Sequence, residues 1–466
     1  MSEFSSLNAA LTGLYAQKRA LDVAGQNITN ANTDGYSRQR VEMSALQGPT
    51  VPSIYSTWAG TGAGVSVDSI SRLRDSFLEQ RAAIEHGQLS AYQTRTGVLH
   101  QVEDVFGEPG DQSIQAQLSA FWNGWDDVAN HPDDLAARQQ LLEKSRTVAG
   151  QFNQVGGGLE AQWTSLREQL GATVENVNAT AQQVAVLNAA IQRGTQSGSD
   201  VNDLADQRDQ LVQQLAQLSG ATVRGGSDGM VDVDLAGGAL VRGTHANALA
   251  VSGVTSFDAV PDPTLGGAPA VDVVWAEGGY SASLAAGTAG GQLAAINTDI
   301  PGYRYRLDTL AQQLATTVNA AHANGFDQNG NAGGPVFTGT TARSLTMALT
   351  SPDQIAANSA PGSLDGAAAQ TVGELGSASD GVDAHYRQLV VSLGVDAQTA
   401  DRQQSIEEAV VQHLDASRES IAGVNLDEEM TNMVAFQHAY EASSRFLSAI
   451  DEALDTLVNH TGMVGR

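Results

Sequence analysis

The chain contains no cysteine among its 466 residues. Disulfide bonds, cysteine-ligated metal sites and cysteine nucleophiles are therefore excluded. Charged residues are also scarce, at 16% of the sequence, against roughly 25% in an average globular domain. The polar surface must consist largely of glutamine, asparagine, serine and threonine.

Basic side chains are few, with 24 Lys and Arg against 52 Asp and Glu, so the net charge is −28. Such a chain repels phosphate backbones and anionic lipid, which argues against nucleic acid as a partner. No apolar run reaches the roughly 18 residues of a membrane-spanning helix, so we expect no membrane insertion. The N-terminus lacks the pattern of a cleavable secretory signal. We expect a protein that is cytoplasmic or exported by a route that reads no such signal.

Motifs of catalysis and cofactor binding are missing as well. The histidines form no His-Glu-x-x-His pattern, and no Gly-x-Ser-x-Gly elbow occurs. The glycines of 60–64 lack dinucleotide-site spacing, and the loop at 327–331 places glycine wrongly for a calcium-binding EF-hand. The sequence therefore predicts no catalytic residue, no metal ligand and no cofactor, and we do not expect an enzyme.

The two ends of the chain carry the strongest positive signal, an apolar residue at about every seventh position. Such a repeat gives a helix one narrow apolar stripe, which favours packing against another helix. We interpret the two stripes as one assembly site, because pairing of the terminal helices would bring the start and the end of the chain to the same place. The stripe residues are Leu7, Leu11, Leu14, Leu21, Ile28, Leu426, Met433, Phe436, Tyr440, Leu447, Ile450, Leu454 and Leu457.

The pattern between the ends predicts a mostly α-helical protein with a β insert. Helical periodicity covers 5–31, about 75–106, 112–129, 133–193, 201–219, 290–323, 383–393, 396–421 and 426–459. Extended segments are expected at 41–70, with Val51 and Ile54 among their apolar residues, and at 221–285, where Met230–Leu235 and Val271–Val273 alternate. Residues 335–380 are expected to form only short, loosely organised segments.

These segments suggest three nested domains. The terminal helices, 1–40 plus 425–466, would form an axial coiled-coil domain. An elongated helical bundle would be built from both halves of the chain, 41–220 plus 286–424, with a short extended β segment at 41–70. Residues 221–285 would form a small β-rich outer domain. An isolated stripe pair buries too little apolar surface to offset its ordering entropy, so we predict terminal segments that are disordered in the free monomer.

Three local patterns carry further expectations. Asn425, with Glu428 three residues later, predicts a helix N-cap of the capping-box type and gives the acids of 427–429 a structural role. Gly156–Gly158 predict a break or kink in the long helix. The aromatic residues Phe121, Trp122 and Trp125 should anchor the helical bundle.

The residues of both ends resemble the terminal motifs of the bacterial flagellar rod, hook and hook-associated protein family. The N-terminal stretch runs from Gln26 to Gln39, and the C-terminal one from Asn425 through Tyr440. Within the family, 36–39 and 424–429 are most similar to the proteins that join hook to filament. The motif residues are Asn27, Asn30, Asn32, Thr33, Gly35, Tyr36, Arg38, Gln39, Asn425, Leu426, Glu428 and Glu429.

The resemblance implies a structural subunit of the junction between hook and filament. Such a protein would leave the cell unfolded through the type III-related flagellar export apparatus and act outside the cell. Its terminal helices would enter the inner tube, and its middle domains would face outward. Its partners would be copies of itself, the hook protein, a second junction protein, and an export chaperone on its C-terminal segment.

Other functions stay open on the sequence alone. Another axial protein, such as hook or distal rod, shares the terminal motifs, although the long helical middle argues against it. A secreted adhesin could use the β insert for binding. An exported wall-cleaving enzyme would need an active-site pattern that the chain does not show.

Overall fold

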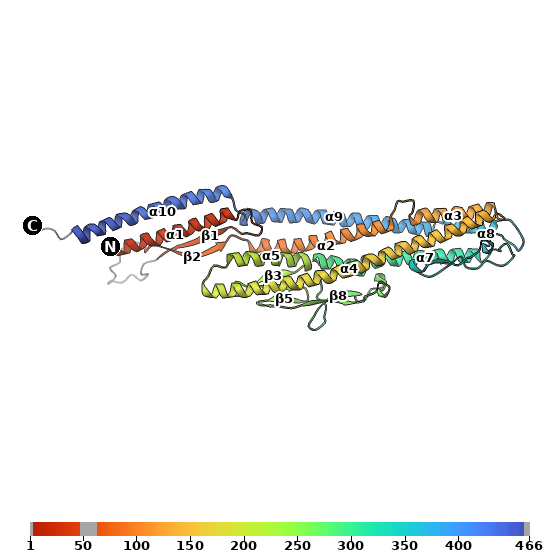
Figure 1. Ribbon diagram of the computed structural model, residues 1–466, viewed down its shortest axis with the longest axis horizontal. Helices are drawn as coiled ribbons and strands as arrows, with labels where there is room; N and C mark the ends of the chain where they lie inside the picture. The colour runs from red at the N-terminus through yellow and green to blue at the C-terminus, as the bar shows by residue number, and fades with distance from the viewer. Residues whose placement is uncertain (1–2, 47–62, 461–466) are drawn as a thin grey trace, which may run out of the picture.

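The computed structural model describes residues 3–46 and 63–460, and Figure 1 shows a long, narrow molecule. It confirms the predicted fold class, mostly α-helical with a small β insert. The predicted features at Val51, Ile54 and Gly60–Gly62 lie outside the described residues.

One end of the molecule is built from both ends of the chain. Helix α1 (Glu3–Thr29) lies beside α10 (Leu426–Asp455), which continues into a π turn at Thr456–His460. The antiparallel strands β1 (Gln39–Ala45) and β2 (Val65–Arg72) pack along α1. We call α1, β1, β2 and α10 the terminal unit, and the remaining elements the body.

The body is a helical bundle drawn from both halves of the chain. Its core is anchored by Phe121, Trp125 and Trp163, all fully buried, so the predicted role of the aromatic residues is confirmed. Its helices are α2 (Ser76–Phe106), α3 (Ile114–Asn130), α4 (Leu135–Ser197), α5 (Asn202–Ser219), α6 (Gly287–Ala294), α7 (Ile300–His322), α8 (Ala367–Glu374) and α9 (Val382–Ala422). Short helical turns are Phe257–Ala259, Pro263–Leu265, Ala295–Asp299, Ala342–Ser344, Pro352–Gln354 and Leu375–Ser377.

Most of the β insert lies on one side of the body, below α4 in Figure 1. Its main sheet has four strands in the order β3 (Thr222–Gly225), β4 (Val231–Leu235), β5 (Gly238–Arg242) and β6 (His245–Ala246). A second sheet pairs β7 (Leu249–Gly253) with β8 (Val271–Trp275). In β4 and β8 every second residue is buried, as the alternation predicted. A separate two-stranded ladder joins β9 (Phe337–Thr338) to β10 (Thr346–Met347).

The predicted break at Gly156–Gly158 is wrong, because α4 runs without interruption from Leu135 to Ser197. The glycines instead allow close packing. A Cβ atom on Gly156 would lie 2.8 Å from Cγ of Arg343, and one on Gly158 would lie 2.8 Å from Cγ1 of Val105. Tertiary packing therefore outweighs the low helix propensity of these glycines.

Two other helix boundaries differ from the prediction. Helix α9 is one element where two were expected, because Leu389, Leu393 and Ala397 continue a buried stripe past Gly394. The predicted helix at 290–323 is divided by a π turn just before Pro301, whose ring nitrogen has no hydrogen to donate. Segment 335–380, expected to be loose, contains the short helix α8.

Candidate assembly site where the chain ends meet

Helix α1 is buried mainly through small side chains. Ala16, Ala20 and Ala24 are at most 2% exposed. Gly13 faces α10, since a Cβ atom placed on it would lie 3.7 Å from Oγ of Ser443. The opposite side of α1 meets the strand pair, where the backbone N–H of Val65 donates to Oγ1 of Thr12 at 3.3 Å. Small residues let α1 lie close to neighbours on two sides.

The leucine stripe of α1 flanks this small-residue face and is only half-buried in one chain. Every predicted stripe position of α1 has this intermediate exposure: Leu7, Leu11, Leu14, Leu21 and Ile28. The large apolar side chains of α1 therefore keep surface that another molecule can cover.

Helix α10 is covered even less. Glu429 is the one fully buried residue between Leu426 and Asp455. The predicted stripe residues Met433, Phe436, Tyr440, Leu447, Ile450 and Leu454 are half-buried, whereas Leu426 and Leu457 are 45% and 52% exposed. Outside the predicted stripe, Met430, Val434 and Phe446 are 54%, 47% and 52% exposed. Such an uncovered apolar surface is typical of an interaction site.

Asn27 makes four hydrogen bonds, one of which joins the two chain ends. Its Nδ2 donates to the backbone oxygen of Gln39 at 2.9 Å and to Oε2 of Glu429 at 3.0 Å. Its Oδ1 accepts from the backbone N–H of Gln39 at 2.9 Å and from the Tyr36 hydroxyl at 2.8 Å. Asn27 is 1% exposed and Glu429 is 3% exposed. These bonds satisfy polar groups that would be costly to bury alone.

Arg38 supplies the positive charge that this buried carboxylate needs. Its Nε donates to Oε1 of Glu429 at 2.8 Å, and its Nη1 lies 2.9 Å from Oε2 of Glu428. The predicted N-cap at Asn425 is confirmed, because its Oδ1 accepts from the backbone N–H groups of Asp427 and Glu428. The reciprocal half of a capping box is absent, since the Glu428 carboxylate reaches Arg38 instead.

The remaining N-terminal motif residues shape the turn after α1. Nδ2 of Asn30 donates to the Gln26 backbone oxygen, and the Thr33 hydroxyl donates to Oδ1 of Asn30. Gly35 has a φ of 76°, and a Cβ atom there would overlap Gln210 of α5. Asn32 is exposed. The turn therefore needs glycine at position 35 both for its backbone angle and for its contact with α5.

The first half of α5 fastens the terminal unit to the body, and the sequence analysis missed it. Oδ2 of Asp206 accepts from the backbone N–H of Ser37 at 3.2 Å, and its Oδ1 lies 2.7 Å from Nη1 of Arg72. Nε2 of Gln39 donates to Oδ1 of Asp203 at 3.4 Å. The spacing of Asp203, Asp206 and Asp209 by three residues is the sequence signal that could have revealed this acidic helix face.

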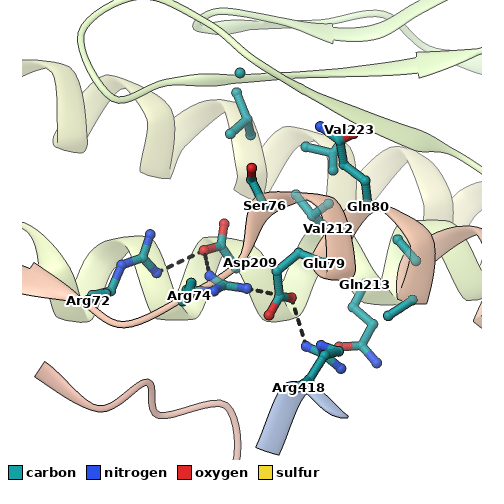
Figure 2. Close-up of a pocket in the computed structure, with 14 residues that line it drawn as sticks. Arg72, Arg74, Ser76, Glu79, Gln80, Asp209, Val212, Gln213, Val223 and Arg418 are labelled. Carbon is teal, nitrogen blue, oxygen red and sulfur yellow. Dashed lines mark hydrogen bonds and ion pairs between the residues drawn. The ribbon is translucent and has the colours of Figure 1, made fainter. Parts of the chain in front are cut away.

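A chain of ion pairs continues from α5 to α9, as Figure 2 shows. Asp209 pairs with Arg72 and Arg74, Arg74 lies 2.7 Å from Glu79, and Glu79 lies 2.8 Å from Arg418. Burial alone would raise the pKa of Asp209, but the neighbouring arginines hold it below its usual value. A cavity of about 250 Å³ lies within this cluster. The cluster joins β2, α2, α5 and α9, so it fixes the neck between the terminal unit and the body.

Burial also raises the pKa of Tyr36, helped by the negative charges of Asp203, Asp206 and Glu429. The Tyr36 hydroxyl thus stays protonated and able to donate to Asn27. Over residues 3–46 and 63–460, no group of three His, Asp or Glu side chains could hold a metal ion. The same part of the chain has no helix with the length and apolar character to cross a membrane.

Comparisons with known proteins place these features in one family. The model of the flagellar hook-associated protein FlgK helical domain matches residues 99–337. Models of the flagella basal body rod protein and of the flagellar basal body rod FlgEFG protein C-terminal match 7–36 and 418–459, the regions that meet in the terminal unit.

Full-length relatives agree with the domain matches. The chain is 31% identical to flagellar hook-associated protein 1 of Bacillus subtilis over 100% of both chains. It is 27% identical to the protein of that name from Escherichia coli, over 98% of this chain and 99% of the other. The flagellar hook junction protein FlgK from Burkholderia pseudomallei shares the fold, with a TM-score of 0.63, 17% identity, and coverage of 74% of this chain and 100% of that one. The chain therefore belongs to the family of flagellar hook-associated protein 1, a structural protein of the bacterial flagellum.

Proposed function

We propose that this protein is a structural subunit of the junction between hook and filament, with no catalytic activity. The observation that carries the proposal is the thin cover of α10, a helix of 30 residues in which only Glu429 is fully buried. A helix with an apolar stripe and so little cover gains stability when other helices pack against it.

The terminal unit is the part that would enter the inner tube, which the copies would form together. Copies would cover the half-buried leucines of α1 together with Met430, Val434 and Phe446 of α10. The body and β insert would face outward, because the terminal unit lies at one end of a long molecule (Figure 1). The Asn27, Arg38 and Glu429 bonds would keep both stripes in register while copies add.

The proposed partners follow from this position. The hook protein would lie on one side of the ring, and a second junction protein on the other. In the cytoplasm an export chaperone would cover the apolar face of α10, as an amphipathic helix bound in a groove. The chain would leave the cell unfolded and take its place outside the cell. The absence of cysteine suits this route, because no disulfide can form before export.

Deleting the gene tests the proposal. We expect electron microscopy to show hooks without filaments, and immunoblots of the spent medium to show shed flagellin. A plasmid copy of the parent gene should restore filaments, which is the control. Normal filaments on the deletion strain would overturn the proposal.

A further inference from the structure

The solvent face of α9 is apolar and basic in an acidic protein. Positions 387, 391, 395, 398, 402, 406, 409 and 413 are three or four residues apart, so they form one ridge, and all are exposed. Val391, Val395 and Ile406 are 64%, 54% and 66% exposed. Arg387, Arg402 and His413 are the ionisable residues of this ridge, which contains no carboxylate.

The acids of α9 lie to either side of the ridge. Several bind neighbouring helices: Oδ2 of Asp396 accepts from the Tyr303 hydroxyl, Asp401 lies 3.0 Å from His100, and Asp415 lies 3.1 Å from His86. With 52 acids against 24 bases in the chain, a ridge without acid differs from the average surface. It lacks the charge that would repel a second copy of this protein.

The solvent face of α4 has the opposite character. Positions 161, 165, 168, 172, 175, 179, 182 and 186 repeat by fours and threes, and all are exposed. They include Ala161, Ala172 and Ala179, with Glu168 and Glu175 between them and no basic residue. The ridge ends at Val186, which is 58% exposed. The α4 ridge therefore carries small side chains and a negative charge.

We propose that the α9 ridge of one copy packs against the α4 ridge of the next copy, which builds a side-by-side contact between bodies. The inference rests on the proposed function, because it needs copies arranged around one axis. Branched aliphatic side chains on α9 would fit the depressions left by the alanines of α4. Arg387 and Arg402 would face Glu168 and Glu175, so the charges are complementary.

The two ridges belong to different helices, and α2 lies between them in the body (Figure 1). A contact between two different surfaces is heterologous. Repeated from copy to copy, it generates a closed ring or a helix rather than a dimer. The body would then contribute to ring formation together with the terminal unit.

Cross-linking tests the contact, and a parent chain without cysteine gives no background reaction. Val395→Cys and Ala172→Cys are expressed together in the deletion strain. Isolated hook–filament structures are then treated with a bismaleimide that spans about 10 Å, near the distance between packed helix axes. We expect cross-linked pairs of chains from the mixture, because each chain carries one thiol, and single chains from each variant alone. Leu265→Cys, on the exposed turn at 263–265, replaces either partner as the control and should not cross-link.

Two outcomes would overturn this contact while the proposed function stands: assembled variants that stay uncross-linked, or one variant that cross-links with itself. If the chains are absent from the isolated structures, the proposed function and the contact fail together.

Charge reversal provides an independent test. Arg387→Glu with Arg402→Glu should reduce complete junctions by about tenfold, because like charges would face each other across the contact. Adding Glu168→Arg and Glu175→Arg to the same chain should restore them. Arg224→Glu with Arg242→Glu, exposed on the β insert, makes the same charge change elsewhere and should leave assembly unchanged. Melting temperatures should match the parent protein throughout, and a rescue that fails in well-folded chains would contradict the proposal.

Discussion

The Asn27 amide nitrogen lies 3.0 Å from Oε2 of Glu429, which follows 402 residues later in the chain. Both side chains are almost completely buried, at 1% and 3% exposed. This contact closes the whole chain into one loop. It joins a residue of the N-terminal family motif to one of the C-terminal motif, so the two motifs are halves of a single polar cluster.

Replacing Asn27 with alanine should open the terminal unit. Asn27→Ala removes a hydrogen-bond donor from the buried carboxylate of Glu429 in α10, a loss of about 2 kcal/mol or more in the pairing of α1 with α10. We expect faster hydrogen exchange in α10 of the assembled chain, measured by mass spectrometry on isolated hook–filament structures, while the body keeps its protection. Asn32→Ala is the matched control, because Asn32 is exposed in the same turn. Equal exchange in the two variants would show that Asn27 is not needed for pairing.

Arg38 should not be replaceable by lysine. A guanidinium group can bond Glu428 and Glu429 together, whereas an ammonium group lacks the planar fork that serves both carboxylates. In the assembled chain, Arg38→Lys should therefore raise the hydrogen-exchange rate of the first turns of α10, and Arg38→Met should raise it further. Arg40→Lys serves as the control, since Arg40 is exposed and pairs with the nearby Glu42. Parent-like exchange in Arg38→Lys would contradict a two-carboxylate role.

Neighbouring apolar residues of α10 should separate pairing from assembly. Leu447 is half-buried, so Leu447→Asp should disrupt the terminal unit and filament formation together. Phe446 is 52% exposed, so Phe446→Asp should keep α10 paired with α1 and still impair assembly. Ser448→Asp adds the same charge at an exposed polar position and should be tolerated. Filaments from the Leu447 variant would refute the assembly role of the stripe. Hydrogen exchange of the parent monomer completes this test, because strong protection of both terminal segments would contradict their predicted disorder.

The body should lose stability as the pH falls below about 6.5, the pKa of histidine in an unfolded chain. Burial, together with the charge of Arg138, lowers the pKa of His322. Its ring accepts from the Ala356 backbone N–H and donates to the Gly334 oxygen, which requires the neutral form. The unfolded chain thus binds the extra proton, and stability falls by at most about 1.4 kcal/mol per pH unit. Melting curves from pH 7 to 5 should show this slope in the parent and in His131→Gln, and a smaller slope in His322→Gln.

Glu407 should have the opposite pH dependence. Burial and the nearby carboxylate of Glu85 raise the pKa of Glu407 to about 7. The folded chain binds the Glu407 proton more tightly than the unfolded chain does, so protonation of Glu407 stabilises the fold. That stabilisation is lost as the pH rises from about 4.3 towards 7. Glu407→Gln should therefore be more stable than the parent above pH 7 and similar to it near pH 4. Glu408→Gln, one residue further along α9, should not show this difference.

The helices and the alternating strands could be predicted because their apolar patterns depend only on local geometry. The breaks predicted at Gly156–Gly158 and near Gly394 were wrong for one reason. Glycine destabilises a helix by only about 1 kcal/mol relative to alanine, and tertiary packing offsets that loss. Sequence periodicity does not show that Gly156 and Gly158 lie against Arg343 and Val105. Gly394 has no such close neighbour, and there the buried residues on either side continue the helix.

The assembly site could be predicted in outline but not in its contacts. A seven-residue repeat indicates a stripe, yet it does not show how many neighbours a helix has. Helix α1 has two, α10 and the strand pair, so Ala16, Ala20 and Ala24 are buried while the leucines stay half-exposed. The ion pairs of Arg72 and Arg74 with Asp209 join residues that are 135–137 positions apart, where no local pattern connects them.

The loop closed by Asn27 and Glu429 also sets the order of events when the chain folds. A chain that emerges N-terminus first exposes α1 early, but the partner of α1 is the last helix to appear. The body can fold from contacts within 76–422, whereas the pairing of α1 with α10 must wait until nearly every residue is free. The stripe surface that we propose for assembly is therefore completed last, after the body has folded.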